Sequence, residues 1–291
     1  MNHTVHIRSV KPGDAPQLAH IQTESWKAAF QQIIPIDILS EYTDPESVTR
    51  MYEHLLTHGI AHGYILELDG APHGTLVLTA HQKAGRGRLG RRFESPAGKG
   101  VYLSLILRPA LSAADAQSAT ISAAVAVARA VKALCGLELG IKWVNDLYYQ
   151  GRKVCGILTE AGTDMESGQL EWLVVGIGLN LTATAEDFPP ELAAKAGSLY
   201  PGGPAPVSRA ALAGAIGREL LALCPGFACL DEYRARCFVP GHWVTVCTGT
   251  ETYAAQALSI DDVGRLVVQR EGGRTEALRC GEVTIRPTKT E

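Results

Sequence analysis

Gln82-Lys-Ala-Gly-Arg-Gly-Arg-Leu-Gly-Arg-Arg-Phe93 packs five cations and three glycines into one short segment between two predicted strands. Glycines allow the backbone to reach positive φ and to approach a ligand closely, so that N–H groups can face an anion. Arginines add forked donors for a phosphate or a carboxylate. This segment, called the Gly/Arg loop below, predicts an anion-binding loop. The alternative interpretation is a solvated basic loop that binds nothing.

The Gly/Arg loop differs from two other phosphate-binding loops. Its Gln82-x-x-Gly85-x-Gly87 pattern formally matches an acetyl-coenzyme-A loop. That loop should open a helix, however, and the chain here continues toward a predicted strand at Val101. No Gly-Lys-Ser/Thr follows, so the segment is not a P-loop.

A second informative segment is Lys142-Trp-Val-Asn-Asp146, which is followed by Arg152-Lys-Val-Cys-Gly-Ile-Leu158. The pattern predicts a strand that ends in Asn145 and Asp146, a turn, and a next strand that begins at Lys153. These three side chains would then cluster at one end of a sheet. A carboxylate beside a lysine can orient an amine, and a lysine can stabilise a developing oxyanion. The alternative is an ordinary hairpin turn, which favours Asn, Asp and Gly anyway.

The third motif is Gly176-Ile-Gly-Leu-Asn180, at the end of another predicted strand. Gly176 and Gly178 would permit close approach of a flat ring or a phosphate, and Asn180 could coordinate such a ligand. The alternative is a bulged strand end.

Strands and helices are predicted on both sides of these motifs. Apolar runs over 64–68 and 74–78 predict a hairpin that turns at Asp69-Gly70. The other predicted elements are a helix over 12–32 with Asp14 as N-cap, strands over 101–107, 140–143, 154–159 and 170–176, a buried helix over 116–134, a helix from Ser208 to about Leu223, and short strands from Val239 onward.

The composition is that of a globular protein. The chain has 291 residues, 46% of them hydrophobic and 20% charged, which is enough for about two domains of roughly 150 residues each. It contains no run of 18 uncharged apolar residues and begins with no apolar signal region. We therefore expect a cytoplasmic protein without a membrane partner. The net charge of −3 argues against a nucleic-acid partner.

The seven cysteines are predicted to be reduced thiols, because their number is odd and the chain is too large to need disulfides. Cys224, Cys229, Cys237 and Cys247 lie close together around His242. Their spacing lacks the tight pair that is usual in structural zinc sites. We interpret them as small core residues.

The three motifs, in this order, resemble those of the biotin–protein ligases. That family carries Gly-Arg-Gly-Arg-x-Gly-Arg, then Lys-Trp-x-Asn-Asp, then Lys-x-x-Gly-Ile-Leu and Gly-x-Gly-x-Asn, and this sequence has all four in register. Gly281-Glu-Val-Thr-Ile-Arg286 is similar to the family's closing Gly-Glu-x-x-x-Arg. The resemblance implies an α+β fold, with a mixed sheet and helices of the class II tRNA-synthetase type over residues 70–238. A small SH3-like β-barrel would follow over residues 239–291.

The resemblance implies a two-step ligase that uses biotin, ATP and Mg²⁺. Biotin and Mg-ATP would give biotinyl-5′-AMP and pyrophosphate, and a lysine of a biotin carboxyl carrier protein would then attack the mixed anhydride. Cations suit the first step because an anionic carboxylate attacks a phosphate. A loop that closes over the intermediate would exclude water. Because the family often dimerises, a homodimer is also implied.

The resemblance assigns a role to individual residues. Lys153, Arg88 and Asp146 are the implied catalytic residues, with Lys153 bridging the biotin carboxyl and phosphate oxygens and Asp146 positioning the incoming lysine. The implied contacts of biotin and the adenylate are Gln82, Gly85, Arg86, Gly87, Arg88, Arg91, Lys153, Gly176 and Gly178, and those of the nucleotide are Asn145, Asn180 and Arg286. The metal would arrive with ATP, and Asn180 is the protein group implied beside it.

The first 69 residues depart from the ligase pattern. The window from Met51 to Gly63 lacks the Ser-Thr-Asn that begins the family's helix before the Gly/Arg loop. Residues 1–70 hold four Lys/Arg against nine Asp/Glu and no basic recognition helix, unlike a DNA-binding domain. Residues 7–35, with 63–70 as a second strand and turn, instead resemble the opening of a GNAT-type acetyltransferase, without its acetyl-coenzyme-A loop. The alternative interpretation of residues 1–70 is an ordinary helical cap. We therefore predict three units, over residues 1–69, 70–238 and 239–291.

Three functions remain open on the sequence alone. The retained cations and Lys153 favour an active biotin–protein ligase. The missing Ser-Thr-Asn favours an impaired relative that binds biotin, ATP or the carrier without catalysis. An acetyltransferase or a lipoate-type ligase is the third hypothesis.

Overall fold

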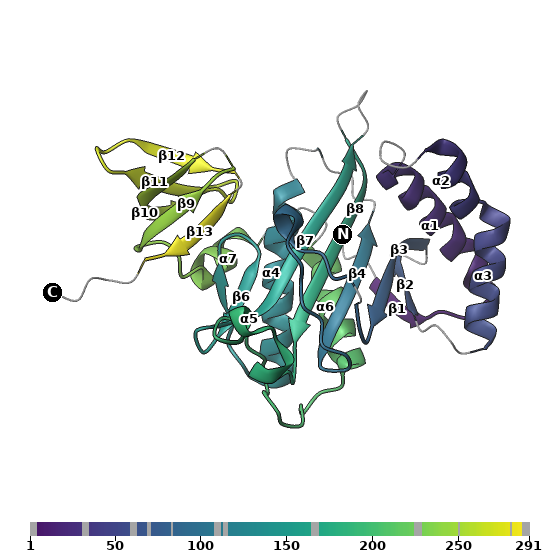
Figure 1. Cartoon of the computed structure of the whole chain (residues 1–291). Coiled ribbons are helices and arrows are strands. Elements are labelled where there is room, and N and C mark those ends of the chain that lie inside the picture. The colour runs from purple at the N-terminus through teal and green to yellow at the C-terminus, as the bar shows by residue number, and fades with distance from the viewer. Residues whose placement is uncertain are drawn as a thin grey trace.

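A computed structural model describes most of the chain (Figure 1). The described residues are 5–30, 35–58, 63–68, 71–82, 84–107, 112, 116–163, 169–223, 229–249, 251–279 and 281–286. The elements up to the third motif are β1 Val5–Ser9, α1 Ala15–Phe30, α2 Ile36–Tyr42, α3 Pro45–Thr57, β2 Gly63–Leu68, β3 Ala71–Thr79, β4 Gly100–Leu107, α4 Ala116–Cys135, β5 Gly140–Lys142, β6 Asp146–Tyr149, β7 Arg152–Thr163 and β8 Leu170–Asn180. They are followed by α5 Pro190–Ala193, α6 Arg209–Leu223, α7 Leu230–Arg236, β9 Trp243–Cys247, β10 Thr252–Ile260, β11 Leu266–Arg270, β12 Thr275–Leu278 and β13 Glu282–Ile285.

The larger sheet has eight strands in the order β1-β2-β3-β4-β8-β7-β6-β5. We expected a mixed sheet, but every ladder between these strands is antiparallel. Within the described residues, parallel pairing is confined to two isolated bridges, Ile141–Cys237 and Lys153–Ala196. Short connections account for the antiparallel pairing of β2 with β3, β5 with β6 and β6 with β7. The pairs β1–β2, β3–β4 and β4–β8 are joined by longer stretches of chain and are antiparallel as well. The predicted hairpin over residues 63–79 is confirmed as β2 and β3.

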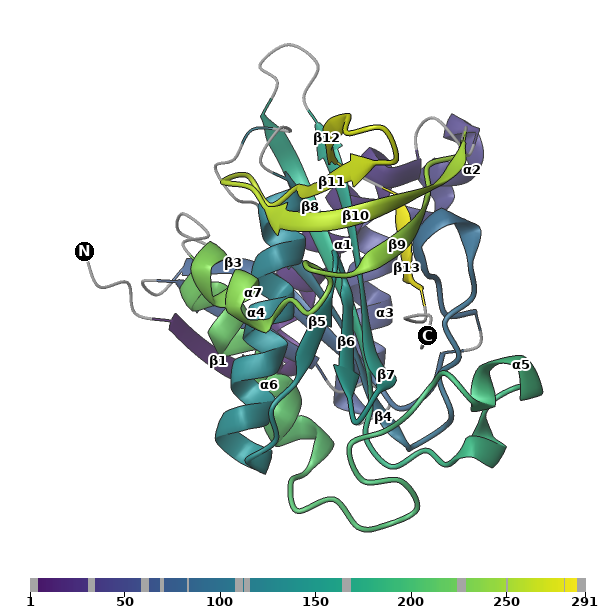
Figure 2. The same ribbon diagram turned by 90° about the vertical axis from the view of Figure 1, so that its left-hand side faces the viewer.

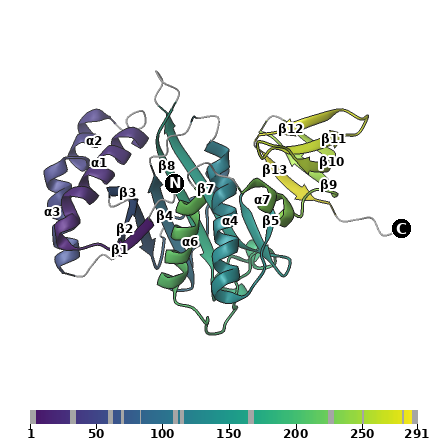
Figure 3. The ribbon, with the colours of Figure 1, turned by 180° about the vertical axis from the view of Figure 1, so that it is seen from behind.

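The two faces of this sheet have different roles, as the alternation along β8 shows. Val175, Ile177 and Leu179 are at most 2% exposed and belong to the core beneath α4 and α6. The intervening residues, Gly176 and Gly178, point to the opposite face. Figure 2 shows α4 and α6 on one side of the sheet, with the segment that precedes β4 and the strand β13 on the other. Figure 3 shows α4 and α6 in front of the sheet.

Helix α4 is the central core helix. Eleven of its residues are buried, among them Val125, Val127 and Val131, which confirms the buried helix predicted over 116–134. It is also long and apolar enough to meet the length and composition criteria for a membrane span. Burial in the core accounts for the apolar composition, since α4 contacts β7, β8, α6 and α7.

The N-terminal segment is part of the larger sheet. β1 pairs antiparallel with β2, so the sheet continues outward past β3. Helices α1, α2 and α3 gather at this end of the molecule (Figure 1). Asp14, the predicted N-cap, immediately precedes α1, and its carboxylate accepts hydrogen bonds from the Arg8 guanidinium (2.7 Å) and the Lys11 backbone N–H (2.7 Å). The predicted boundary at Asp69-Gly70 lies outside the described residues, between two paired strands, and stays a prediction.

The C-terminal segment forms a separate antiparallel sheet, in the order β12-β11-β10-β9-β13. We expected a small barrel, but within the described residues the end strands β12 and β13 do not pair, so the sheet is open. Its buried side chains include Val244, Val246 and Val283. Trp143 attaches the turn after β5 to this segment, because its indole Nε1 donates to the carbonyl oxygen of Gly264 (3.0 Å).

Candidate active site

The Gly/Arg loop closes on itself. The backbone N–H of Gly87 donates to the carbonyl of Arg91 (2.7 Å), and that of Phe93 donates to the carbonyl of Gly85 (2.9 Å). A short 3₁₀ turn at the tip, Arg88–Gly90, ends in a glycine with φ +73°. These two hydrogen bonds close the base of the loop, and the arginine side chains extend from it in different directions.

Gly85 is required at the base of this loop by close packing. A Cβ at this position would lie 2.3 Å from the carbonyl oxygen of Phe93 and 3.0 Å from Oε1 of Gln82. Ser95 Oγ donates to the same Gln82 oxygen (2.7 Å). Gln82 and Gly85, both implied biotin contacts, therefore lie together where the loop leaves the sheet.

Gly178 of the third motif and Gly156 on the neighbouring strand lie under an aromatic ring. Gly178 on β8 is the cross-strand partner of Gly156 on β7. A Cβ on Gly178 would lie 2.3 Å from Cε1 of Phe93, and one on Gly156 would lie 3.1 Å from its Cε2. The flat ring that these glycines admit is thus, in this structure, the side chain of Phe93. At Gly176 a Cβ would meet only ordinary contacts with Leu158, starting at 3.5 Å.

Lys153 and Asp146 form an ion pair across β7 and β6. Lys153 Nζ lies 2.6 Å from Asp146 Oδ1, and the side chains are 35% and 21% exposed. The predicted proximity of these residues is confirmed. The backbone of Lys153 is held as well, because its N–H donates to Lys195 O (2.9 Å) and its carbonyl accepts from Gly197 N (2.8 Å).

Asn145 connects the Gly/Arg loop to the sheet. Its Oδ1 accepts from Arg88 Nη1 (3.0 Å), and its Nδ2 donates to the carbonyl of Ile157 (2.8 Å). The predicted strand end at Asn145-Asp146 was wrong: β5 already ends at Lys142, a tight turn follows, and Asp146 begins β6. The reason is that β5 and β6 form a hairpin, which places the Asn side chain at its tip.

The other arginines of the loop pair with separate carboxylates. Arg86 Nη2 lies 2.9 Å from Glu160 Oε1 on β7. Arg91 Nη1 donates to Glu282 Oε1 on β13 (2.9 Å), and a second hydrogen bond joins Nη2 to Oε2. The implied ligand contacts Arg86, Arg88 and Arg91 therefore start from one loop and reach three different elements.

Asn180 and Arg286 were implied nucleotide contacts. Asn180 is 4% exposed, its Nδ2 donates to Gly197 O (3.0 Å), and its Oδ1 has no hydrogen-bond partner within the described residues. A buried acceptor without a partner fits an amino group or a cation of a ligand. Arg286 Nε donates to Thr245 Oγ1 (2.9 Å) on the C-terminal sheet, and among the described side chains no hydrogen bond joins it to the larger sheet.

Lys142 and Glu282 were given no role by the sequence, although both stand in quoted motifs. Lys142 is the cross-strand partner of Asp146. Burial lowers the pKa of the Lys142 ammonium, although the carboxylates of Asp146 and Glu282 oppose this shift. The signal that could have found Lys142 is its place three residues before Asn145, in the same motif. The contact of Glu282 with Arg91 depends on the tertiary structure, and no sequence signal indicated it.

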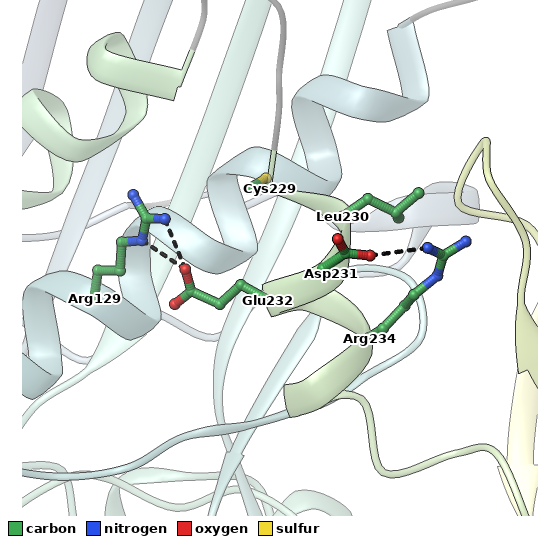
Figure 4. A pocket seen from close by; sticks show the side chains of 6 residues that line it. All are labelled: Arg129, Cys229, Leu230, Asp231, Glu232 and Arg234. Carbon is green, nitrogen blue, oxygen red and sulfur yellow. Dashed lines mark hydrogen bonds and ion pairs between the residues drawn. The ribbon is translucent and has the colours of Figure 1, made fainter.

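Two further features lie away from these residues. The described cysteines are free thiols, and within the described chain no three His, Cys, Asp or Glu side chains gather as a metal site. Cys224 lies outside the described residues. A surface pocket on α4 and α7 is lined by Arg129, Cys229, Leu230, Asp231, Glu232 and Arg234 (Figure 4). Its charges pair internally, with Arg129 on Glu232 and Arg234 on Asp231.

Comparison with known proteins identifies the family. Residues 63–180 match the "Biotin/lipoate A/B protein ligase family". The "Bifunctional ligase/repressor BirA" of Bacillus spizizenii is 33% identical over 235 residues, which cover 77% of this chain and 70% of the relative. The "Biotin--[acetyl-CoA-carboxylase] ligase" of Paracoccus denitrificans is 36% identical over 216 residues, covering 68% and 85%. The chain therefore belongs to the biotin/lipoate protein ligase family.

A solved structure supports the same fold. The biotin protein ligase from Aquifex aeolicus in complex with biotin and ATP aligns with a TM-score of 0.60 and 24% sequence identity. The alignment covers 75% of this chain and 91% of that structure. At this identity the likeness concerns the fold, an α+β arrangement with antiparallel sheets.

Proposed function

We propose that this protein is an ATP-dependent ligase that activates biotin as biotinyl-5′-AMP and transfers it to a lysine of a biotin carboxyl carrier protein. The observation that carries the proposal is the gathering of Arg88, the Lys153–Asp146 pair and the glycines of β7 and β8 on one face of the sheet. The Paracoccus denitrificans relative, whose name states biotin ligation, matches over this region.

The side chains suit the first step, adenylation. An oxygen of the biotin carboxylate forms a bond to the α-phosphorus of ATP, and the bond to the pyrophosphate oxygen breaks. Negative charge accumulates on the phosphoryl oxygens, and cations placed beforehand stabilise it. Lys153 and Arg88 are the cations assigned to this task, and Arg86 and Arg91 bind the anionic groups of the substrates.

Asp146 serves the second step, the attack of the carrier lysine on the adenylate. Its carboxylate lies at the start of β6 and is held by Lys153. A carboxylate in this place can orient an incoming ammonium group and balance its charge while the amine is deprotonated. The leaving group is AMP, whose phosphate stays beside the same cations.

The nucleotide is assigned to Asn145, Asn180 and Arg286. Asn180 fits because its buried Oδ1 lacks a partner among the described residues. Mg²⁺ is proposed to arrive with the ATP phosphates, where it would neutralise their charge, and Asn180 is the protein group assigned to it.

Several finer properties belong to the same proposal. The Paracoccus relative is named as a ligase of acetyl-CoA carboxylase, which supports a carboxylase carrier domain as the partner. We further propose a cytoplasmic protein that forms a homodimer, an SH3-like origin for the C-terminal sheet, and a GNAT-like origin for residues 1–69. The order β1, helices, β2 and β3 is compatible with that origin.

The test is biotin-dependent exchange of pyrophosphate into ATP by the purified full-length protein. Exchange that requires biotin supports the ligase. If exchange requires lipoate and does not occur with biotin, the substrate is lipoate and not biotin. No exchange by a folded protein would contradict the ligase and favour an impaired binding protein. Phe93 on Gly156 and Gly178 is the observation that favours this second candidate, because its ring covers the glycines that a substrate would approach.

A further inference from the structure

One carboxylate of the C-terminal sheet forms an ion pair with the Gly/Arg loop. Glu282 is the first residue of β13, and both of its oxygens accept hydrogen bonds from the Arg91 guanidinium, one of them at 2.9 Å. Paired donors and acceptors of this kind fix orientation as well as distance. The contact joins parts of the chain that lie 191 residues apart, so that the C-terminal sheet contacts the loop directly.

The implied nucleotide contact Arg286 follows directly after the same strand. Residues two apart on a strand share a face, so Glu282 and Arg286 project from one side of β13 and its extension. Arg286 is held by Thr245 on the neighbouring strand β9. This face of the C-terminal sheet therefore presents a carboxylate to a loop whose expected ligand is itself an anion.

Glu282 contacts Arg91 and lies within electrostatic range of two lysines of the active site. The hydrogen bond from Arg91 lowers the pKa of the Glu282 carboxyl below its ordinary value, and the charges of Lys142 and Lys153 act in the same direction. Asp146 is the other carboxylate among these groups, since its charge acts on both Arg91 and Lys142. Three cations thus share two carboxylates, and only one of these carboxylates comes from the larger sheet.

We propose that Glu282 is an internal counter-ion of the active site, which holds Arg91 in the ligand-free protein and is displaced when a polyphosphate binds. A phosphate group offers the same guanidinium a similar pair of oxygens and more negative charge. Glu282 is a positioning residue, because it acts through Arg91 and does not need to touch the substrate. The proposal rests on the proposed function only for the identity of the polyphosphate.

The pair is suited to displacement because it is exposed. The Arg91 side chain is 64% exposed and that of Glu282 is 35% exposed. Exposed ion pairs contribute little to stability and are screened by salt. Loss of the competing carboxylate should therefore strengthen polyphosphate binding only modestly, by about two- to fivefold, and most clearly at low ionic strength.

The experiment measures binding of inorganic pyrophosphate to the ligand-free full-length protein by calorimetry at low and high salt. Glu282→Gln should lower the Kd about two- to fivefold at low salt, and the difference should shrink at high salt. Limited trypsin digestion of the ligand-free variant should cleave the Gly/Arg loop faster than in the wild type. Glu282→Asp, which keeps the charge, should lie closer to the wild type in both measurements.

Glu251→Gln is the matched control. Glu251 is also a carboxylate of the C-terminal segment that pairs with an arginine, Arg270. It lies in the connection between β9 and β10, not on β13. It should leave the Kd for pyrophosphate and the cleavage of the loop unchanged.

Several outcomes would overturn the proposal. These are an unchanged or weaker affinity of the folded Glu282→Gln variant, the same gain in Glu251→Gln, or no binding of pyrophosphate to either protein. The proposed function has its own readout, the biotin-dependent exchange by the wild type. If the wild type shows no exchange but the Glu282→Gln variant binds pyrophosphate more tightly, the counter-ion proposal is supported and the ligase function is contradicted.

Discussion

At the scale of single residues, the Lys153–Asp146 pair has the most clearly defined chemical role in the proposed site. Lys153 is positioned twice, by its ion pair and by the backbone contacts of its strand with residues 195–197. Removal of its side chain should therefore leave the strand in place and remove a charge that matters most in the transition state.

Lys153→Ala should lower biotin-dependent pyrophosphate exchange by about 100-fold or more. Its melting temperature should stay close to that of the wild type, because a partly exposed ion pair contributes about 0–1 kcal/mol. Lys195→Ala is the control, since this exposed neighbour contacts Lys153 through its backbone. Exchange at the wild-type rate in Lys153→Ala would remove the residue from the mechanism.

Gly178 tests the packing of the Phe93 ring. Gly178→Ala places a methyl group 2.3 Å from Phe93 Cε1, so the ring must move. We expect a loss of about 1–3 kcal/mol in the free energy of unfolding, measured by denaturant titration. The double variant with Phe93→Leu should recover part of this loss, because the smaller side chain clears the space. Full stability of Gly178→Ala alone would show that the ring does not rest on this strand.

At the scale of elements, the Gly/Arg loop acts as a closed hairpin whose arginines attach to other elements. Arg88 is the arginine that joins it to the turn between β5 and β6, through Asn145. Arg88→Gly should weaken closure of the loop over the labile intermediate. Release of free biotinyl-adenylate, followed by chromatography, should rise relative to transfer to the carrier. If release did not rise, closure would depend on other contacts.

A second element-level prediction concerns the attachment of β1 to α1. The Arg8 hydrogen bond is the largest cause that lowers the pKa of the Asp14 carboxyl in the folded protein. A depressed folded pKa contributes stability above the unfolded value of about 3.9, and this contribution is lost as the pH falls through the folded value. Asp14→Asn should therefore lower the melting temperature at pH 7.

The difference between Asp14→Asn and the wild type should vanish in strong acid, where both side chains are neutral. Asp37→Asn, on the exposed surface of α2, serves as control and should change the melting temperature little at either pH. A difference that persists in strong acid would assign the effect to packing and not to charge.

At the scale of the whole molecule, the eight-stranded sheet unites the N-terminal segment with the ligase region. β3 pairs with β2 on one side and with β4 on the other. A protein that starts at residue 70 would lose β1 and β2 and expose β3 as a long edge strand with the apolar run Leu76-Val-Leu78. Such edges promote aggregation.

The fragment 70–291 should therefore be less soluble than the full-length protein and should melt at a lower temperature. Sedimentation and thermal denaturation at equal concentration provide the measurement. A fragment as soluble and stable as the full chain would instead support residues 1–69 as a separate unit, as the charge and motif pattern of the sequence predicts.

The sequence alone determined the features that depend on local pattern. The hairpin over residues 63–79, the buried helix α4 and the helix after Ser208 follow from apolar periodicity and turn or cap chemistry. Ser208 Oγ accepts from Ala211 N at 3.1 Å, as an N-cap does. The motifs identified the family and the proximity of Lys153 to Asp146, because both residues belong to neighbouring strands of short connection.

Only the tertiary structure decided which distant parts meet. No local signal indicates that Phe93 covers Gly156 and Gly178, or that Glu282 pairs with Arg91, because strand pairing and sheet packing bring these residues together over long stretches of chain. The pairing of β1 with β2 and of β4 with β8, across long stretches of chain, likewise made the larger sheet antiparallel and continuous with β1. The C-terminal sheet is open within the described residues. Pairing between strands that are distant in sequence depends on hydrogen bonds with partners elsewhere in the chain, which no local pattern encodes.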